Sequence, residues 1–359
     1  MRIGYAGLGW ATHAFHLPGV RRMPSVEIVG GCDPSEAERA RWERETRTPS
    51  FATLRELLEQ AAPETVVVAT PPASHAELCV QSLRAGAHVF CEKPFVSTLA
   101  EADDVLAAAA AAGRHVAVNH QYREMPIFRA VKQAIGSSEA GRLVFCQMWQ
   151  LMNLAPWDEP VEWRAAMPNR TLFEGGVHLV DLLLHLYEER PAGVYAQRSS
   201  GLDAGREADA IQLVTLDFPS GRLAQITIDR LCQGGTRYLE LRADCERASL
   251  RASHGGRALL KLGKKRAERT GIHLELAPGG LAWMEQGLRH KTLAREPRSA
   301  GQDATARLFG HVVAAFRAAG QEPPSSGREA RTTLEVIEAA YRSGDTGERV
   351  AISQAAATT

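Results

Sequence analysis

The chain has 359 residues, more than one compact core usually holds, so we expect two domains. Its 42 basic residues balance its 42 acidic ones, which excludes the strong positive field that gathers nucleic acid or an anionic membrane surface. The six cysteines show no C-x-x-C spacing, so we expect neither a metal site nor a disulfide framework. A small-molecule partner, with no nucleic acid and no membrane, is the resulting expectation.

Short apolar runs alternate with amphipathic stretches over residues 1–121. This alternation is typical of strands and crossover helices in a parallel sheet. It predicts an α/β dinucleotide-binding (Rossmann) domain over residues 1–121. The expected strands are 3–6, 26–32, 65–69, 88–91 and 116–119, and the expected helices are 10–22, 35–47, 54–61, 74–85 and 98–112.

The pattern changes over residues 122–359. Strand-like runs joined by turns dominate residues 193–262, as in the pair 211–218 and 223–230 around Pro219-Ser220-Gly221. We expect a C-terminal α+β domain with a large, mostly antiparallel sheet. Its other elements are a long strand over 142–152 and helices near 125–135, 177–187, 304–319 and 328–343.

No apolar run approaches the roughly 20 residues that span a bilayer. The first expected strand follows Met1 closely, with no leader pattern before it. These features predict a cytoplasmic protein.

A dinucleotide fingerprint follows the first expected strand. Gly7 permits a tight turn, Gly9 lets backbone N–H groups approach a pyrophosphate, and Thr12 replaces the usual third glycine. The alternative is a purely structural glycine turn. The predicted phosphate-binding positions are Gly7, Leu8, Gly9, Trp10 and Ala11.

Asp33 ends the second expected strand, where a carboxylate accepts hydrogen bonds from the adenosine ribose. This position predicts NAD. Arg39 and Arg41 on the next helix offer charge to a 2′-phosphate, so NADP stays open. The alternative is that Asp33 caps the helix at Ser35.

The expected strands 65–69 and 88–91 run into Thr70-Pro71-Pro72-Ala73-Ser74-His75 and Glu92-Lys93-Pro94. Ligands of open α/β sheets bind at the carboxyl ends of the strands. A lysine there can hold a substrate hydroxyl and stabilise a developing alkoxide. The alternative for Lys93 is a surface residue in a turn.

The segment 174–181 carries Glu174, His178 and Asp181. Residues four apart on a helix share a face, so Glu174 and His178 are expected to point into one site. An imidazole is suited to take a hydroxyl proton as hydride leaves carbon. The alternative is a histidine of the hydrophobic core.

Together these residues resemble the Gfo/Idh/MocA family over the whole chain. The segments that carry the resemblance are Gly7-Leu8-Gly9, Asp33-Pro34, Thr70-Pro71-Pro72 with His75, Glu92-Lys93-Pro94, Trp163-Arg164 and Gly176-x-His178-x-x-Asp181. The resemblance implies that Lys93 and His178 are the catalytic pair. Glu174 stands where the family usually has an aspartate, and we expect it to position the substrate.

The resemblance also implies the remaining contacts. Thr70, Pro71, His75, Glu92, Lys93 and Arg164 are expected to line the cofactor, and Asn119, Gln121, Glu174, Lys93 and His178 the substrate. The alternative for Asn119 and Gln121 is an ordinary capped strand end.

The function implied is an NAD(P)-dependent oxidoreductase acting on the secondary alcohol or ketone of a sugar, nucleotide sugar or cyclic polyol. The C-terminal sheet is expected to cover the nicotinamide with one face and to form a homodimer or homotetramer with the other. Two alternatives stay open: a glycosidase that oxidises its substrate transiently with NAD, and a regulator that binds NAD(P) without turnover.

Overall fold

The computed structural model describes residues 1–152, 170–201, 209–233, 239–255, 257–265, 268–277, 280–318 and 320–354. The described chain forms two compact units. Unit 1 comprises Met1–Met125 and Ser299–Ile337, and unit 2 comprises Pro126–Arg298 and Glu338–Gln354. The predicted domain boundary after residue 121 stays a prediction.

The core of unit 1 is a six-stranded sheet in the order β3-β2-β1-β4-β5-β6, with every pair of neighbours parallel. The order reverses between β1 and β4, and a Rossmann sheet binds its ligand at that switch point. Its central strands are buried on both faces, as continuous apolar runs predict. The strands are β1 Arg2–Ala6, β2 Glu27–Cys32, β3 Ser50–Phe51, β4 Thr65–Val68, β5 His88–Cys91 and β6 Val116–Val118.

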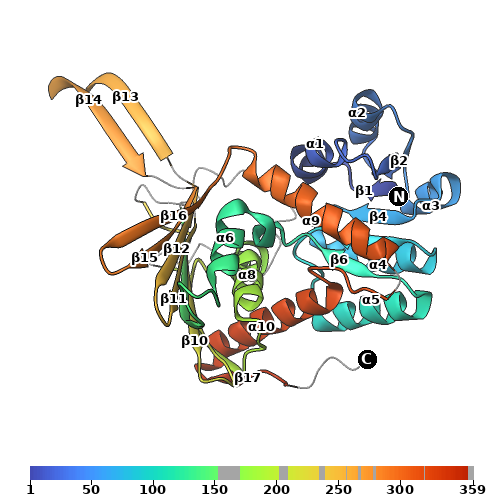
Figure 1. The fold of residues 1–359 in the computed structure, drawn as a ribbon. Coiled ribbons are helices and arrows are strands. Elements are labelled where there is room, and N and C mark those ends of the chain that lie inside the picture. Colours follow the sequence, from blue (N-terminus) through green and yellow to red (C-terminus); the bar gives the residue numbers. More distant parts are fainter. Residues whose placement is uncertain are drawn as a thin grey trace. The chain divides into compact units, whose positions relative to one another are not determined.

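Helices connect these strands (Figure 1). Thr53 and Thr98 begin two of them with complete capping boxes, in which each threonine side chain accepts from a backbone N–H of the first turn. The elements are η1 Thr12–His16, α1 Leu17–Val20, α2 Glu36–Thr46, α3 Leu54–Ala61, η2 Pro72–Ser74, α4 His75–Arg84, α5 Leu99–Ala112 and η3 Gln121–Glu124.

Helix α9 (Ala300–Arg317) belongs to unit 1 although it lies far along the chain. Its Leu308 and Phe309 are buried in one cluster with Ile3 and Tyr5 of β1. A side chain at Gly19 would bring its Cβ to 2.3 Å from Cβ of Ala306, so α1 approaches α9 more closely than any larger residue permits.

Unit 2 is built on a nine-stranded sheet in the order β16-β15-β12-β11-β7-β10-β9-β8-β17. The pair β7 and β10 is parallel and the other pairs are antiparallel. Strands β13 (Arg257–Lys265) and β14 (Glu268–Ala277) form a separate two-stranded sheet. The nine strands are β7 Leu143–Leu151, β8 Gly193–Ser199, β9 Ile211–Asp217, β10 Leu223–Asp229, β11 Leu239–Cys245, β12 Ser249–His254, β15 Leu281–Gln286, β16 Arg289–Arg295 and β17 Val350–Ala351.

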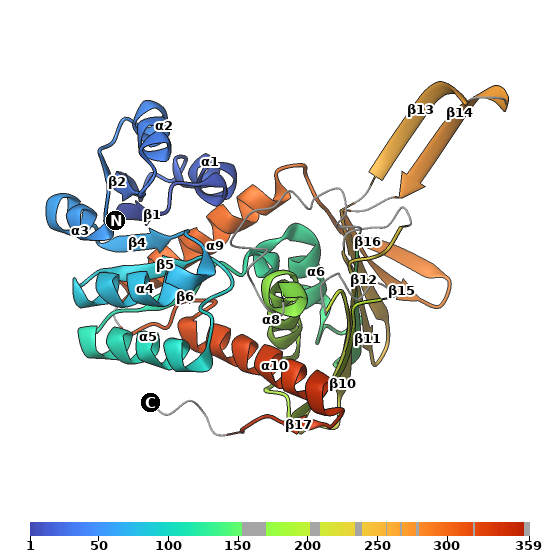
Figure 2. The ribbon, with the colours of Figure 1, turned by 180° about the vertical axis from the view of Figure 1, so that it is seen from behind.

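Helices α6 (Pro126–Ala134) and α8 (Val177–Tyr187) cover one face of this sheet (Figure 2). Helix α8 continues the π-helical turn η4 (Thr171–Gly176). Alternate residues of β7, such as Cys146 and Met148, point to the covered face and are fully buried. The last long helix, α10, spans Gly327–Thr346.

The expected fold class is confirmed: a parallel Rossmann sheet is joined by a large, mostly antiparallel sheet. The short edge strand β3 was not expected, because two residues are too few to show a pattern. Within the described residues, we find no helix with both the length and the apolarity that crossing a bilayer requires.

Candidate active site

The loop after β1 uses its two glycines differently. The backbone of Gly7 has φ +92°, and a Cβ there would lie 2.6 Å from the carbonyl oxygen of Ala69. The N–H of Gly7 donates to the carbonyl of Cys32, 2.9 Å away. A Cβ on Gly9 would meet no atom within 4 Å. Gly7 is therefore required by the turn itself, whereas a side chain at Gly9 would enter open space, and the pyrophosphate contact of Gly9 stays a prediction.

Thr12 occupies the position of the third glycine and is fully buried. Its hydroxyl donates to the carbonyl of Gly7 at 2.7 Å, so it ties the helix back to the loop. Between them, Trp10 is 68% exposed and packs edge-to-face on Phe15. The fingerprint thus keeps a closed turn without its third glycine.

The carboxylate of Asp33 lies beside this loop at the end of β2. Its two oxygens accept from the N–H groups of Leu8 at 2.9 Å and Ser35 at 2.8 Å. Both contacts fix the carboxylate at the position predicted for a ribose contact, and the bond to Ser35 also serves the turn before α2. The alternative that Asp33 caps α2 is wrong, because Ser35 is the N-cap and its hydroxyl accepts from the N–H of Glu38, while the ribose contact of Asp33 stays a prediction.

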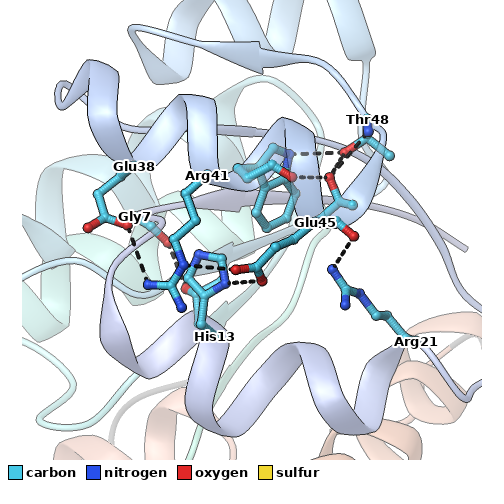
Figure 3. A network of polar contacts seen from close by, with 10 residues as sticks. Gly7, His13, Arg21, Glu38, Arg41, Glu45 and Thr48 are labelled. Carbon is cyan, nitrogen blue, oxygen red and sulfur yellow. Dashed lines mark hydrogen bonds and ion pairs between the residues drawn. The ribbon is translucent and has the colours of Figure 1, made fainter.

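The two arginines considered for a 2′-phosphate are held by protein groups. Arg39 donates to the carbonyls of Asp33 at 2.8 Å and Pro34 at 2.9 Å. Arg41 donates to Glu45 at 2.9 Å (Figure 3). The other carboxylate oxygen of Glu45 lies 2.9 Å from Nδ1 of His13. These contacts favour a cofactor that brings no extra phosphate.

The loops after β4 and β5 are joined by His75, which is fully buried. Its Nε2 lies 2.8 Å from the carbonyl oxygen of Thr70, and its Nδ1 lies 2.9 Å and 3.0 Å from those of Pro94 and Phe95. Burial, partly offset by these carbonyls, lowers the pKa of His75. The side chain of His75 thus bridges the two loops, while its predicted cofactor contact stays a prediction.

Glu92 and Lys93 follow β5, and Lys93 precedes a cis peptide bond to Pro94. The Oε1 atom of Glu92 lies 2.7 Å from Nε2 of His16 and accepts from the amide of Asn119 at 2.6 Å. Its Oε2 accepts from the N–H of Lys93 at 3.1 Å. The carboxylate predicted to line the cofactor is therefore the centre of a polar cluster that includes the backbone N–H of Lys93.

The charge of Glu92 follows from these contacts. Burial by itself would raise its pKa, but the hydrogen bonds and charge of His16, the amide of Asn119 and the charge of Lys93 outweigh burial and lower the pKa of Glu92 to about 2. The carboxylate is ionised at neutral pH and only accepts hydrogen bonds, so Nε2 of His16 carries the proton.

The end of β6 presents further polar atoms. Asn119 is 1% exposed, and its Oδ1 has no hydrogen-bond partner in the described chain. Oε1 of Gln121, in η3, likewise has none there. Buried acceptors usually have a donor, and the predicted substrate contacts of Asn119 and Gln121 stay predictions.

In unit 2, Glu174 lies in η4 and His178 in the first turn of α8. Oε2 of Glu174 lies 3.6 Å from a guanidinium nitrogen of Arg230, which follows β10 and is 5% exposed. A Cβ on Gly175 would lie 2.7 Å from that guanidinium, and one on Gly176 would lie 2.7 Å from Ile228. The two glycines therefore allow the helix to press against β10 and Arg230 to reach Glu174.

The first turn of η4 is anchored from two other elements. The N–H of Thr171 donates to Asp209 at 2.8 Å, and the hydroxyl of Tyr341 donates to the same oxygen at 2.8 Å. The N–H of Leu172 donates to Tyr341 at 3.0 Å. These bonds satisfy N–H groups that a helix start leaves without intrahelical partners. The helix carrying Glu174 and His178 thus starts from a fixed point.

Two candidate residues were not identified from the sequence, His16 and Arg230. His16 reads as one more histidine in an apolar helix, and Arg230 as a charged residue at a strand end, so neither carries a spacing signal. Arg164, predicted to contact the cofactor, lies outside the described residues, as does Trp163.

Comparison with known proteins gives two matches in chain order. Residues 1–120 match the model described as "Oxidoreductase family, NAD-binding Rossmann fold", and residues 128–251 match the "GFO/IDH/MocA C-terminal domain". The chain is 26% identical over 345 residues to D-apiose dehydrogenase of Paraburkholderia graminis, covering 93% of this chain and 85% of that protein. It is 28% identical over 212 residues to 1,5-anhydro-D-fructose reductase of Ensifer adhaerens, and this match covers 58% of this chain and 63% of that protein.

A solved oxidoreductase from Agrobacterium radiobacter, in complex with NAD+, L-tartaric acid and magnesium, shares the fold with a TM-score of 0.82. The match covers 98% of both chains at 15% identity. The family models, the named dehydrogenases and reductases and the fold agree. This protein is an NAD-binding oxidoreductase that belongs to the Gfo/Idh/MocA family.

Proposed function

We propose that this protein transfers hydride between a nicotinamide cofactor and the secondary alcohol or ketone of a sugar, nucleotide sugar or cyclic polyol. The observation that carries the proposal is the carboxylate of Glu92, which accepts hydrogen bonds from Asn119 and from the N–H of Lys93 and lies 2.7 Å from Nε2 of His16. Both residues stand at the carboxyl edge of the sheet that also carries the Gly7–Gly9 loop. A lysine at this edge of the sheet is suited to stabilise an alkoxide that forms beside the cofactor.

The cofactor we propose is NAD in preference to NADP. The open space at Gly9 fits a pyrophosphate, and the fixed carboxylate of Asp33 fits the ribose hydroxyls. A 2′-phosphate would meet the negative charge of Asp33, while Arg41 is engaged by Glu45. Replacing Asp33 by glycine is therefore expected to reduce the difference between the dissociation constants for NAD and NADP.

The chain's own groups have separate roles in the proposed reaction. Bound NAD+ supplies the hydride acceptor. Lys93 holds the substrate oxygen, His178 takes the hydroxyl proton, and the C–H hydrogen leaves as hydride, so the alcohol is oxidised to a ketone. Glu174, fixed by Arg230, orients a neighbouring hydroxyl, and Asn119 and Gln121 offer further polar contacts.

The substrate class is supported by the names of relatives. D-apiose dehydrogenase and 1,5-anhydro-D-fructose reductase are named for sugar substrates. The amide, carboxylate and imidazole groups proposed to contact substrate match a molecule rich in hydroxyl groups.

The test is NADH absorbance with purified protein, NAD or NADP, and a panel of sugars and cyclic polyols. We expect turnover in the wild type and a loss of about a hundredfold or more in kcat for Lys93→Ala and His178→Ala. Lys291→Ala and His290→Ala are matched controls, because both side chains are more than half exposed on β16. NAD binding without NADH formation for every compound would contradict the proposal.

We also propose that the protein forms a homodimer or homotetramer through the outer face of the nine-stranded sheet. Val144, Tyr195, Leu213 and Leu223 are 40–51% exposed there. Apolar side chains gathered on an exposed face are suited to bind a second copy. Sedimentation at the mass of one chain would contradict this assembly.

A further inference from the structure

His16 is buried in a place where an apolar side chain would cost less. It is 0% exposed and ends the π-helical turn η1, which follows the dinucleotide-binding loop. Its ring meets Tyr5 and Phe90 edge-on, with centroids 6.1 Å and 6.0 Å apart. In these surroundings a histidine is disfavoured unless a specific polar contact offsets its desolvation.

The contact is with Glu92. The Nε2–H of His16 donates to Oε1, and the 2.7 Å distance is in the range of a charge-assisted hydrogen bond. Asn119 donates to the same oxygen, and its amide also lies 3.5 Å from the hydroxyl of Thr305 on α9. Oε2 is left to the N–H of Lys93. Donors from η1, the end of β6 and the β5 loop thus fix the carboxylate.

We propose that His16 is a positioning residue for catalysis: it fixes Glu92, and Glu92 fixes the backbone and charge environment of Lys93. This inference rests on the proposed function, because it assigns the purpose of the contact to Lys93. It also links the helix that follows the pyrophosphate loop to the group that holds the substrate oxygen.

His13 provides an internal comparison. It lies in the same π-helical turn, and its Nδ1 is 2.9 Å from a carboxylate oxygen of Glu45 (Figure 3). The side chain of Glu45 is 40% exposed, against 13% for Glu92. Glu45 lies in helix α2, whereas Glu92 follows strand β5 and precedes Lys93. If both histidine–glutamate pairs only stabilised the helix, replacing either histidine would have the same effect on kcat. The proposal predicts that only the replacement of His16 lowers kcat.

The first experiment compares kcat and KM for His16→Leu, His16→Gln and the control His13→Leu. We expect His16→Leu to lower kcat by about ten- to a hundredfold with the dissociation constant for NAD changed less than about twofold. Glutamine keeps a donor at the reach of Nε2, so His16→Gln should recover kcat to within about threefold. Equal effects of His13→Leu and His16→Leu, or no rescue by glutamine, would overturn the proposal.

A double-variant cycle tests whether His16 acts through Glu92. We expect Glu92→Ala alone and Glu92→Ala with His16→Leu to show the same kcat within about threefold, because alanine leaves no acceptor for His16 and the contact is already broken. Losses that multiply would show that His16 acts by another route and would overturn the inference.

Long-range ¹H–¹⁵N spectra of ¹⁵N-histidine protein read the contact without turnover. His16→Gln identifies the His16 signals, which should show the Nε2–H form in the wild type and should move in Glu92→Gln. Signals that ignore Glu92→Gln would refute the contact. If the wild type turns over no compound, the proposed function fails, and these spectra alone decide whether His16 fixes Glu92.

Discussion

Gly7 and Gly9 stand two positions apart in one loop, yet different atoms constrain them. A side chain at Gly7 would collide with the backbone of Ala69 and would sit at a positive φ. A side chain at Gly9 would reach open space. We therefore expect stability to depend on Gly7 and the approach of the cofactor to depend on Gly9.

We expect Gly7→Ala to lower the free energy of unfolding by about 2 kcal/mol or more, since a left-handed backbone and a steric overlap both count against alanine. Gly9→Ala should unfold like the wild type but bind NAD about tenfold more weakly, because its methyl group occupies the space of the pyrophosphate. Urea unfolding and titration calorimetry separate the two. Similar stability losses in both variants would contradict this division of roles.

The sequence was sufficient to identify candidate site residues where a motif contains them, as for Asp33, Lys93 and His178. The contacts of those residues were not. The hydrogen bond between His16 and Glu92 joins residues 76 positions apart. The approach of Arg230 to Glu174 depends on Gly175, where a Cβ would lie 2.7 Å from the guanidinium group. Such pairs are products of tertiary packing, which a local pattern does not encode.

At the scale of elements, the strands of the Rossmann sheet were predictable because buried parallel strands are short apolar runs. The two π-helical turns, η1 and η4, were not, because one inserted residue leaves the apolar spacing of a helix nearly unchanged. Both turns carry residues proposed for the site, His16 and Glu174. The spacing argument that placed Glu174 and His178 on one face assumed a regular α-helix.

The loops after β4 and β5 depend on one another through His75. We expect His75→Phe to lower the free energy of unfolding by about 1–3 kcal/mol, because the ring N–H that donates to a carbonyl oxygen of these loops is lost. The control His311→Phe, 55% exposed on α9, should change it by less than about 0.5 kcal/mol. Denaturant unfolding followed by far-ultraviolet circular dichroism measures both, and equal values for the two variants would argue against the bridge.

At the scale of the whole molecule, acid stability should depend on His88. Burial, then the charges of Arg114 and His115, lower the pKa of His88 from 6.5 to about 4. Its ring stacks on Phe316 with centroids 4.5 Å apart. Between pH 6.5 and 4 the unfolded chain binds a proton that the folded chain does not, so stability falls as the pH falls through this window.

The measurement is the midpoint of thermal unfolding across that range. We expect a decline from pH 6.5 to 4 in the wild type and a shallower one in His88→Asn, which has no titrating ring. Glu92 acts in a different window, because its pKa is lowered from 4.5 to about 2 and its contribution is lost only below pH 4.5. A slope unchanged by His88→Asn would assign the decline to other groups.

Helix α9 has a consequence for the order in which the protein matures. During synthesis the nucleotide-binding sheet is complete once residue 118 has been made, but Leu308, Phe309, Val312, Val313 and Phe316 of its core come far later. A nascent chain ending at residue 298 holds Ile3, Tyr5 and Phe90 with part of their packing surface still exposed. The ribosome must therefore make residues 126–298 of the second unit before the first unit can close, and until then the N-terminal part of the chain depends most on chaperones.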